Sequence, residues 1–189
     1  YPDSPVVEMD SVIGRVGVKV VLTIHFNNCG LLLAFLRNAN NSQSVIDIFN
    51  MIDNLLTREV FKRLFPVILT DNGSEFSNPN ALETDSGSGE QRTRIFYCNA
   101  YSSWQKGHVE NNHLNLRKVL PKGSSFDSLN QTDINLMLSH VNSFARKSLN
   151  DTAAITLFET IYGKDILPKL NIKLISQNAV CLLPELIGK

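Results

Sequence analysis

The chain has 189 residues, of which 43% are hydrophobic, and this fits one domain with a full hydrophobic core rather than two. Eighteen basic and eighteen acidic residues give a formal net charge of zero, so the overall charge does not indicate a nucleic-acid partner. The distribution is uneven, however. Residues 66–91 contain acidic side chains and no Lys or Arg, whereas Glu110 is the only acid among the six basic residues of 92–122.

Cysteine usage and hydropathy indicate a cytoplasmic protein without a membrane anchor. The three cysteines are far apart and form no C-x-x-C pair, so neither a disulfide framework nor a zinc site is indicated. The longest apolar runs, 20–22 and 31–36, are far shorter than the roughly 18 residues that span a bilayer, and no signal-peptide pattern opens the chain. Because the first residue is Tyr1 and not Met, we expect a piece of a longer protein.

The first third of the chain predicts a three-stranded antiparallel meander. Residues 6–14 and 16–28 are rich in Val and Ile, and Val18, Val20, Leu22, Ile24 and Phe26 alternate along one face of the second segment. Short turns at 14–17 and 27–30 connect these strands to each other and to a third strand at 31–36.

The period of the apolar residues then changes from two to 3.6, which predicts one long helix over 42–65, with Asn41 or Ser42 as N-cap and Pro66 ending it. A short strand follows at 67–70. The polar, Gly- and Ser-rich stretch 77–91 predicts a mobile loop.

The second half of the chain is predicted to begin with a strand at 93–98. A loop then leads to a helix over 107–120 that Pro121 stops. Asp127 or Ser128 is expected to start a helix that continues to about residue 147, with Leu129, Ile134, Met137, Leu138 and Val141 facing inward. A helix at 154–162 and an irregular tail complete the prediction.

Three acidic residues lie at positions suited to chemistry in this order of elements. Asp10 lies in the first strand, Asp71 directly follows the fourth, and Glu110 begins the helix after the fifth. A right-handed crossover would place the fourth strand parallel to the first, which makes Asp10 and Asp71 neighbours. Carboxylates on adjacent strands and a nearby helix suit hard divalent cations, and two such ions roughly 4 Å apart can catalyse phosphoryl displacement.

Three motifs in this order resemble the catalytic core of the DDE transposase and retroviral integrase superfamily, most closely bacterial insertion-sequence transposases with an integrase-type core. The motifs are EMDSVIG (8–14), TDNGSEF (70–76) and YSSWQKGHVEN (101–111), and the resemblance covers roughly residues 5–162. It implies an α/β, ribonuclease H-like fold: a mixed five-stranded sheet, with three antiparallel and two parallel strands, flanked by helices. It also implies that Asp10, Asp71 and Glu110 are catalytic and bind Mg²⁺ or Mn²⁺, as two ions.

The chain departs from the family pattern at two places. The second and third acids are 110 − 71 = 39 positions apart, somewhat more than is usual in the family, and the loop at 77–91 can absorb the excess at little entropic cost. Thr152-Ala153 stands where relatives usually have Thr-Pro, which affects the alignment of the C-terminal part but not the triad.

Each acid also has a purely structural interpretation. Asp10 could simply accept a hydrogen bond from a backbone donor. Asp71 could serve merely to form the turn that Asp-Asn-Gly favours, and Glu110 merely to stabilise a helix start. Glu8, two residues before Asp10, is expected to be structural or to support the site from outside the metal shell. Glu75 is expected to serve the turn after Asp71.

A positive rim around the acids would suit a DNA phosphodiester. The candidate DNA-binding residues are Lys106, His108, His113, Arg117, Lys118 and Lys122, together with Trp104 as a stacking platform. The alternatives are a solvated basic helix face, a core histidine at His113 and local packing of Trp104.

The resemblance implies a bacterial transposase core that hydrolyses the phosphodiester at element ends and joins the 3′ hydroxyl to target DNA, working as a homo-oligomer on the nucleoid. We expect an integrase-type catalytic core over 1–165 and a C-terminal extension over 166–189. The N-terminal helix-turn-helix domain of relatives has no match here. The alternatives are a ribonuclease H-like nuclease on another substrate and a domesticated module that binds DNA without catalysis.

Overall fold

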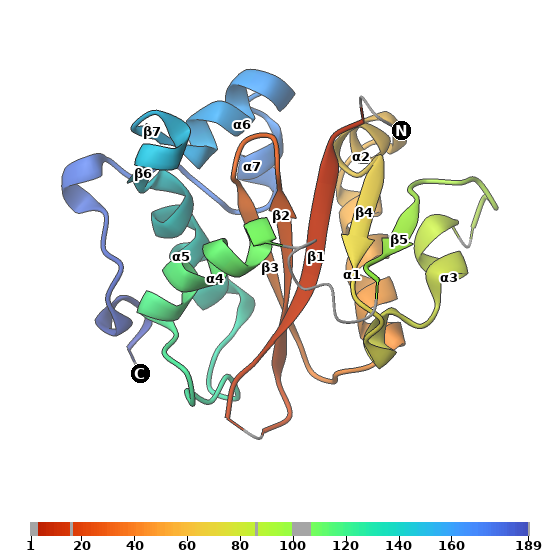
Figure 1. Ribbon diagram of the computed structural model, residues 1–189, viewed down its shortest axis with the longest axis horizontal. Helices are drawn as coiled ribbons and strands as arrows, with labels where there is room; N and C mark the ends of the chain where they lie inside the picture. The colour runs from red at the N-terminus through yellow and green to blue at the C-terminus, as the bar shows by residue number, and fades with distance from the viewer. Residues whose placement is uncertain (1–3, 16, 86, 100–106, 189) are drawn as a thin grey trace.

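The computed structural model describes residues 4–15, 17–85, 87–99 and 107–188 (Figure 1), and in the helix that begins at Gly107 the described side chains start at His113. A five-stranded mixed sheet has the order β3-β2-β1-β4-β5. Its strands are β1 (Val6–Ile13), β2 (Val20–Phe26), β3 (Leu32–Arg37), β4 (Val67–Thr70) and β5 (Ile95–Tyr97). The first three pair antiparallel, and β4 is parallel to both β1 and β5. The predicted ribonuclease H-like topology, including the crossover that returns β4 beside β1, is confirmed.

Helices cover the sheet on both sides (Figure 1). Helices α1 (Ser42–Leu55) and α2 (Arg58–Leu64) lie on one side, and α4 (Gly107–Val119) and α5 (Gln131–Ser143) on the other. All seven residues of β2 are therefore buried, and not only the alternate ones. Val18, expected on the inward face, lies before the strand and is 68% exposed. The alternation of large apolar residues predicted the strand but not its second covered face.

The predicted helix over 42–65 is two helices. The backbone of Leu56 is extended (φ −107°, ψ 165°), and Thr57 then caps α2 by accepting from Val60 N–H (3.4 Å). The apolar stripe continues across this break, because Ile52 and Phe61 belong to the same core, and it therefore predicted a single helix. Asn41 caps α1 as expected, accepting from Ser44 N–H at 2.9 Å.

The predicted mobile loop at 77–91 contains ordered structure. Asn78 caps the short helix α3 (Pro79–Glu83), and Thr84 forms an antiparallel bridge with Gln91. Arg92 is 1% exposed. Its guanidinium donates to Leu82 O (2.8 Å) and to Asn50 Oδ1 on α1 (2.8 Å). These contacts hold segment 77–91 against α1. The polar composition of the segment did not indicate this ordered packing.

The second half of the chain has a different helix boundary from the predicted one. Helix α5 starts after Asn130, which forms a reciprocal capping box with Asp133, and not at Asp127 or Ser128. It ends at Ser143, and a small two-stranded sheet and 3-10 turn fill the residues up to the next helix. The remaining elements are β6 (Ala145–Arg146), β7 (Thr152–Ala153), α6 (Ala154–Tyr162) and α7 (Ile166–Lys169), with 3-10 turns η1 (Ser74–Phe76), η3 (Lys147–Leu149), η4 (Gln177–Ala179) and η5 (Pro184–Ile187).

The chain after α7 runs back along α5 and is bound to it by polar contacts. The backbone N–H groups of Lys173 and Cys181 donate to Ser139 Oγ (3.2 Å) and His140 Nδ1 (3.0 Å). Ile187, near the end of this segment, is buried in the common core. Across the residues described, no helix combines the length and apolarity that crossing a bilayer requires.

Candidate active site

Asp10 lies in the central strand of the sheet, with neighbours on both sides. Its Cα is paired with Thr23 of β2, and Oδ1 accepts from Ser11 N–H at 2.9 Å. The side chain is 23% exposed, so the carboxylate is only partly removed from water. The β1–β4 pairing ends at Glu8, and the ladder with β2, which continues to Ile13, holds the backbone of Asp10.

The TDNGSEF segment forms a turn that is attached to both neighbouring strands. Thr70 Oγ1 donates to Met9 O of β1 (3.2 Å), and Asn72 Nδ2 donates to Cys98 O just past β5 (3.2 Å). Between them, Asp71 Oδ1 accepts from Gly73 N–H at 3.0 Å, which is the Asx-type turn expected of Asp-Asn-Gly. Asp71 is thus held at the end of β4 with a half-buried side chain.

The strand register brings the two aspartates to the same level of the sheet. β1 and β4 are parallel with Glu8 paired to Leu69, so two residues further along each chain lie Asp10 and Asp71. The register agrees with the predicted neighbourhood of these two residues, and the meeting of their carboxylates stays a prediction. Carboxylates on adjacent parallel strands, one within β1 and one just past β4, are hard oxygen donors of the kind that Mg²⁺ and Mn²⁺ prefer.

His113 of α4 connects the helix to Asp10. The hydroxyl proton of Thr23 goes to Asp10 O (3.1 Å), so the Nε2–H of His113 donates to Thr23 Oγ1 (2.9 Å). The other ring nitrogen, Nδ1, then faces Asp10 Oδ2 at 3.9 Å. The imidazole of His113 therefore lies over Asp10. It is neither buried in the apolar core nor located on the outer face of the helix.

Glu110 is the fourth residue of α4, one helical turn before His113. Its side chain, like that of His108, is outside the described residues, and so are Trp104 and Lys106 altogether. Among the side chains that the structure describes, no three His, Cys, Asp or Glu residues are grouped as a metal site would require.

The basic residues further along α4 have different partners. Arg117 donates to Ile13 O at the end of β1 (3.1 Å), and burial lowers the pKa of its guanidinium. Lys118 Nζ donates to Asn115 Oδ1 (3.1 Å) and lies 5.3 Å from the centre of the Phe144 ring, on the side of α5. Lys122 is exposed in the turn after the helix.

Sequence reasoning missed Thr23 and a buried polar cluster beside it on the same face of the sheet. Glu8, which is 1% exposed, accepts from Asn27 Nδ2 (2.9 Å), and Asn27 Oδ1 accepts from the Nδ1–H of His25 (3.0 Å). Glu8 and His25 are paired across β1 and β2, directly next to the pair of Asp10 and Thr23. The only sequence signal was the period of two that links Glu8 to Asp10.

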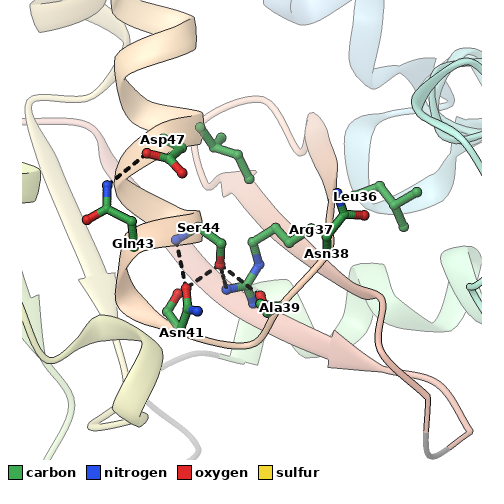
Figure 2. Close-up of a pocket in the computed structure, with 9 residues that line it drawn as sticks. Leu36, Arg37, Asn38, Ala39, Asn41, Gln43, Ser44 and Asp47 are labelled. Carbon is green, nitrogen blue, oxygen red and sulfur yellow. Dashed lines mark hydrogen bonds between the residues drawn. The ribbon is translucent and has the colours of Figure 1, made fainter.

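A separate pocket of about 390 Å³ opens where β3 joins α1 (Figure 2). Its lining includes Arg37, Asn38, Asn41 and Asp47, and neither Asp10 nor Asp71. The pocket therefore does not coincide with the paired aspartates.

No protein-family model matches the chain. It is 26% identical over 162 residues to the transposase of insertion sequence element IS4351 from Bacteroides fragilis, which covers 84% of this chain and 45% of that protein. It is 31% identical over 80 residues to the transposase of IS1086 from Cupriavidus metallidurans, which covers 42% and 22%. The chain is related in sequence to insertion-sequence transposases.

The chain is also similar to a putative integrase in sequence and to a chain of a retroviral intasome in fold. The putative integrase ORF3 of Spiroplasma virus SpV1-R8A2 B is 24% identical over 151 residues, covering 80% of this chain and 44% of that protein. A chain of the simian T-cell lymphotropic virus intasome superposes with a TM-score of 0.60 at 15% identity, over 80% of this chain and 53% of that one. The fold is therefore that of the integrase core, and the chain spans less than half of each of these curated relatives.

Proposed function

We propose that the chain is the catalytic core of a DNA transposase, which uses divalent metal ions to cut a phosphodiester and to join a 3′ hydroxyl to target DNA. The observation that carries the proposal is the register that sets Asp10 level with Asp71 on adjacent parallel strands. The similarity to transposases supports DNA as the proposed substrate among the nucleic acids that an integrase-type fold could take. By the same analogy we propose that the protein works as a homo-oligomer.

In this proposal Asp10, Asp71 and Glu110 are the catalytic residues and the metal ligands. Residues three apart on a helix share a face, and His113 faces Asp10 Oδ2 at 3.9 Å. Because Glu110 is three positions before His113 in α4, we propose it as the third ligand beside the two aspartates. Two bound Mg²⁺ or Mn²⁺ ions would activate the attacking oxygen and stabilise the leaving one.

The remaining residues have supporting roles in the proposal. Thr23 holds the backbone of Asp10 by donating to its carbonyl oxygen, and the hydrogen bond between Thr23 and His113 keeps the imidazole beside the Asp10 carboxylate. The turn hydrogen bond from Gly73 N–H fixes one oxygen of Asp71. The basic side chains at Lys106, His108, Arg117, Lys118 and Lys122, with Trp104, are proposed to contact DNA, where Lys and Arg neutralise phosphate.

The test is the substitution Asp71→Asn, which keeps the size of the side chain and removes its charge. We expect Mn²⁺ affinity and Mn²⁺-dependent nicking of a supercoiled plasmid to fall by more than the about 100-fold that loss of an outer metal partner can cost. The matched control is Asp47→Asn, which removes one exposed carboxylate from α1 and should change neither quantity. Nicking that persists in Asp71→Asn would overturn the proposal. A wild-type chain that binds DNA without Mn²⁺ uptake or nicking would favour the non-catalytic module instead.

A further inference from the structure

The last residue of β3, Arg37, is a buried cation that reaches the strand of Asp10. It is 2% exposed. One of its terminal nitrogens donates to Ser11 Oγ (2.7 Å) and to Asn40 Oδ1 (3.0 Å), and the other donates to Ser44 Oγ (3.1 Å). Ser11 directly follows Asp10, so the guanidinium ties the middle of β1 to the edge of the sheet and to the first turn of α1. Figure 2 shows this side chain running from β3 to Ser44.

All three of these hydrogen-bond partners are neutral, and the charge that acts on Arg37 comes from Glu75. Burial lowers the pKa of the Arg37 guanidinium to about 10, and the carboxylate of Glu75 opposes that decrease. Glu75 is itself 8% exposed and belongs to the turn η1 that follows Asp71. No ion pair joins the two directly among the described side chains, so this attraction acts through space. The geometric connection runs through α1: Arg37 holds its first turn through Ser44, and η1 packs against α1.

Glu75 is also packed against the turn that holds Asp71. A β-carbon built on Gly73 would lie 2.6 Å from Glu75 Oε2 and 3.0 Å from Asp71 Oδ1. The two carboxylates therefore approach the same glycine, and a methyl group at this position would displace one of them. A displacement of Glu75 would consequently be passed on to the Asp71 turn.

We propose that Arg37 is a positioning residue: it holds the segment of Asp10 through Ser11 and, through Ser44 and the packing of α1 on η1, the turn of Asp71 with its buried Glu75, and so sets the spacing of the two aspartates. Its importance for catalysis rests on the function proposed above. The spacing itself is a property of the metal-free chain. Arg37 contacts no substrate or metal in this role and acts only through the two segments.

The first test needs no metal and compares hydrogen exchange in two variants, Arg37→Gln and Arg92→Gln. Arg92 is the matched control because it is an equally buried arginine, 1% exposed, whose carboxylate partner is Asp53 of α1 (3.4 Å). We expect Arg37→Gln to speed exchange about tenfold in peptides covering both 9–13 and 71–77, with residues 80–92 unchanged. Arg92→Gln should speed exchange at 80–92 and leave 9–13 and 71–77 unchanged. Equal effects of both variants, or no effect of Arg37→Gln on one of the two segments, would overturn the proposal.

The second test is Mn²⁺ titration of the same chains, at a temperature where each is folded. Loss of an outer partner costs about 10- to 100-fold in metal affinity, and we expect this range for Arg37→Gln and for Glu75→Gln. The double variant should lose less than the product of the two single losses, because the first substitution already leaves the partner without its charge. Arg37→Lys keeps the charge and should recover part of the affinity. Wild-type affinity in Arg37→Gln, or losses that multiply fully, would contradict the assignment. If the wild-type chain takes up no Mn²⁺, the proposed function fails and the exchange experiment still decides the positioning role.

Discussion

The side-chain amide of Asn142 is hydrogen-bonded twice to the backbone of Leu32: Nδ2 donates to Leu32 O (2.8 Å), and Oδ1 accepts from Leu32 N–H (2.9 Å). Gln131, at the other end of α5, binds β3 in a similar way. Its Oε1 accepts from the N–H of Leu36, and its Nε2 donates to the carbonyl of Ala34. These side chains pair backbone groups of an edge strand that would otherwise lack a partner strand, and so attach α5 to the sheet.

We expect Asn142→Ala to lower the free energy of unfolding by about 2 to 4 kcal/mol, because two buried backbone groups of Leu32 lose their partner. Urea denaturation monitored by circular dichroism measures the change. Thr132→Ala on the same helix is the control, since Thr132 is exposed. Equal losses in the two variants would show that helix composition, and not the edge contact, is responsible.

Arg92→Gln should lower the free energy of unfolding by about 2 to 4 kcal/mol, because Asn50 Oδ1 loses a charged donor and buried Asp53 keeps only Arg58 (3.0 Å) as an ion-pair partner among the described residues. The same substitution removes the bonds to Leu82 O and Ala81 O that anchor α3. Chemical denaturation again gives the magnitude. Lys62→Gln, which breaks the exposed ion pair with Glu90, should have a far smaller effect.

Gly73→Ala should lower Mn²⁺ affinity several-fold. The change in the thermal unfolding temperature should be small. The added methyl group must displace the carboxylate of Glu75 or that of Asp71, which lie 2.6 Å and 3.0 Å from its position. Calorimetric titration and thermal unfolding of the same sample separate the two effects. Gly87→Ala is the control, since its β-carbon would have only an ordinary contact with Asp85 at 3.7 Å. A Gly73→Ala chain with unchanged Mn²⁺ affinity would show that the turn has room to adjust.

Acidification should destabilise the contact between the C-terminal segment and α5. Burial lowers the pKa of His140 in the folded chain, so below the unfolded value of 6.5 the unfolded state binds more protons. This contribution to stability is complete above about pH 6.5 and is lost as the pH falls toward the folded pKa. Protonation of Nδ1 also removes the acceptor for Cys181 N–H. We expect His140→Asn, which retains an acceptor, to flatten the decrease in stability between pH 7 and 5. The same slope in both chains would contradict this.

The arrangement of the sheet could be predicted from sequence because it depends on local patterns and one general rule. Runs of Val and Ile located the strands, and the right-handed crossover placed β4 beside β1, which set Asp10 and Asp71 level. The break between α1 and α2 was missed because the apolar stripe continues past Thr57, although a threonine before Arg58 and Glu59 is itself an N-cap signal.

The buried polar contacts could not be predicted, because their partners are distant in the sequence. Arg92 and Asp53 are 39 positions apart, and Asn142 and Leu32 are 110 apart. Thr23 was not predicted for a related reason. It lies between the apolar residues that defined the inward face of β2, and its partner His113 is 90 positions away. Periodicity indicates which face is apolar and gives no information on polar residues that are satisfied by remote groups.

The two aspartates differ in how far their backbones can shift. Asp10 is inside β1 and paired with Thr23 of β2, whereas Asp71 follows the last residue of β4 and precedes a turn. The first aspartate is therefore positioned by the sheet itself and the second by a turn that side chains hold, so substitutions at Thr70, Asn72 or Gly73 can shift Asp71 while Asp10 stays in place.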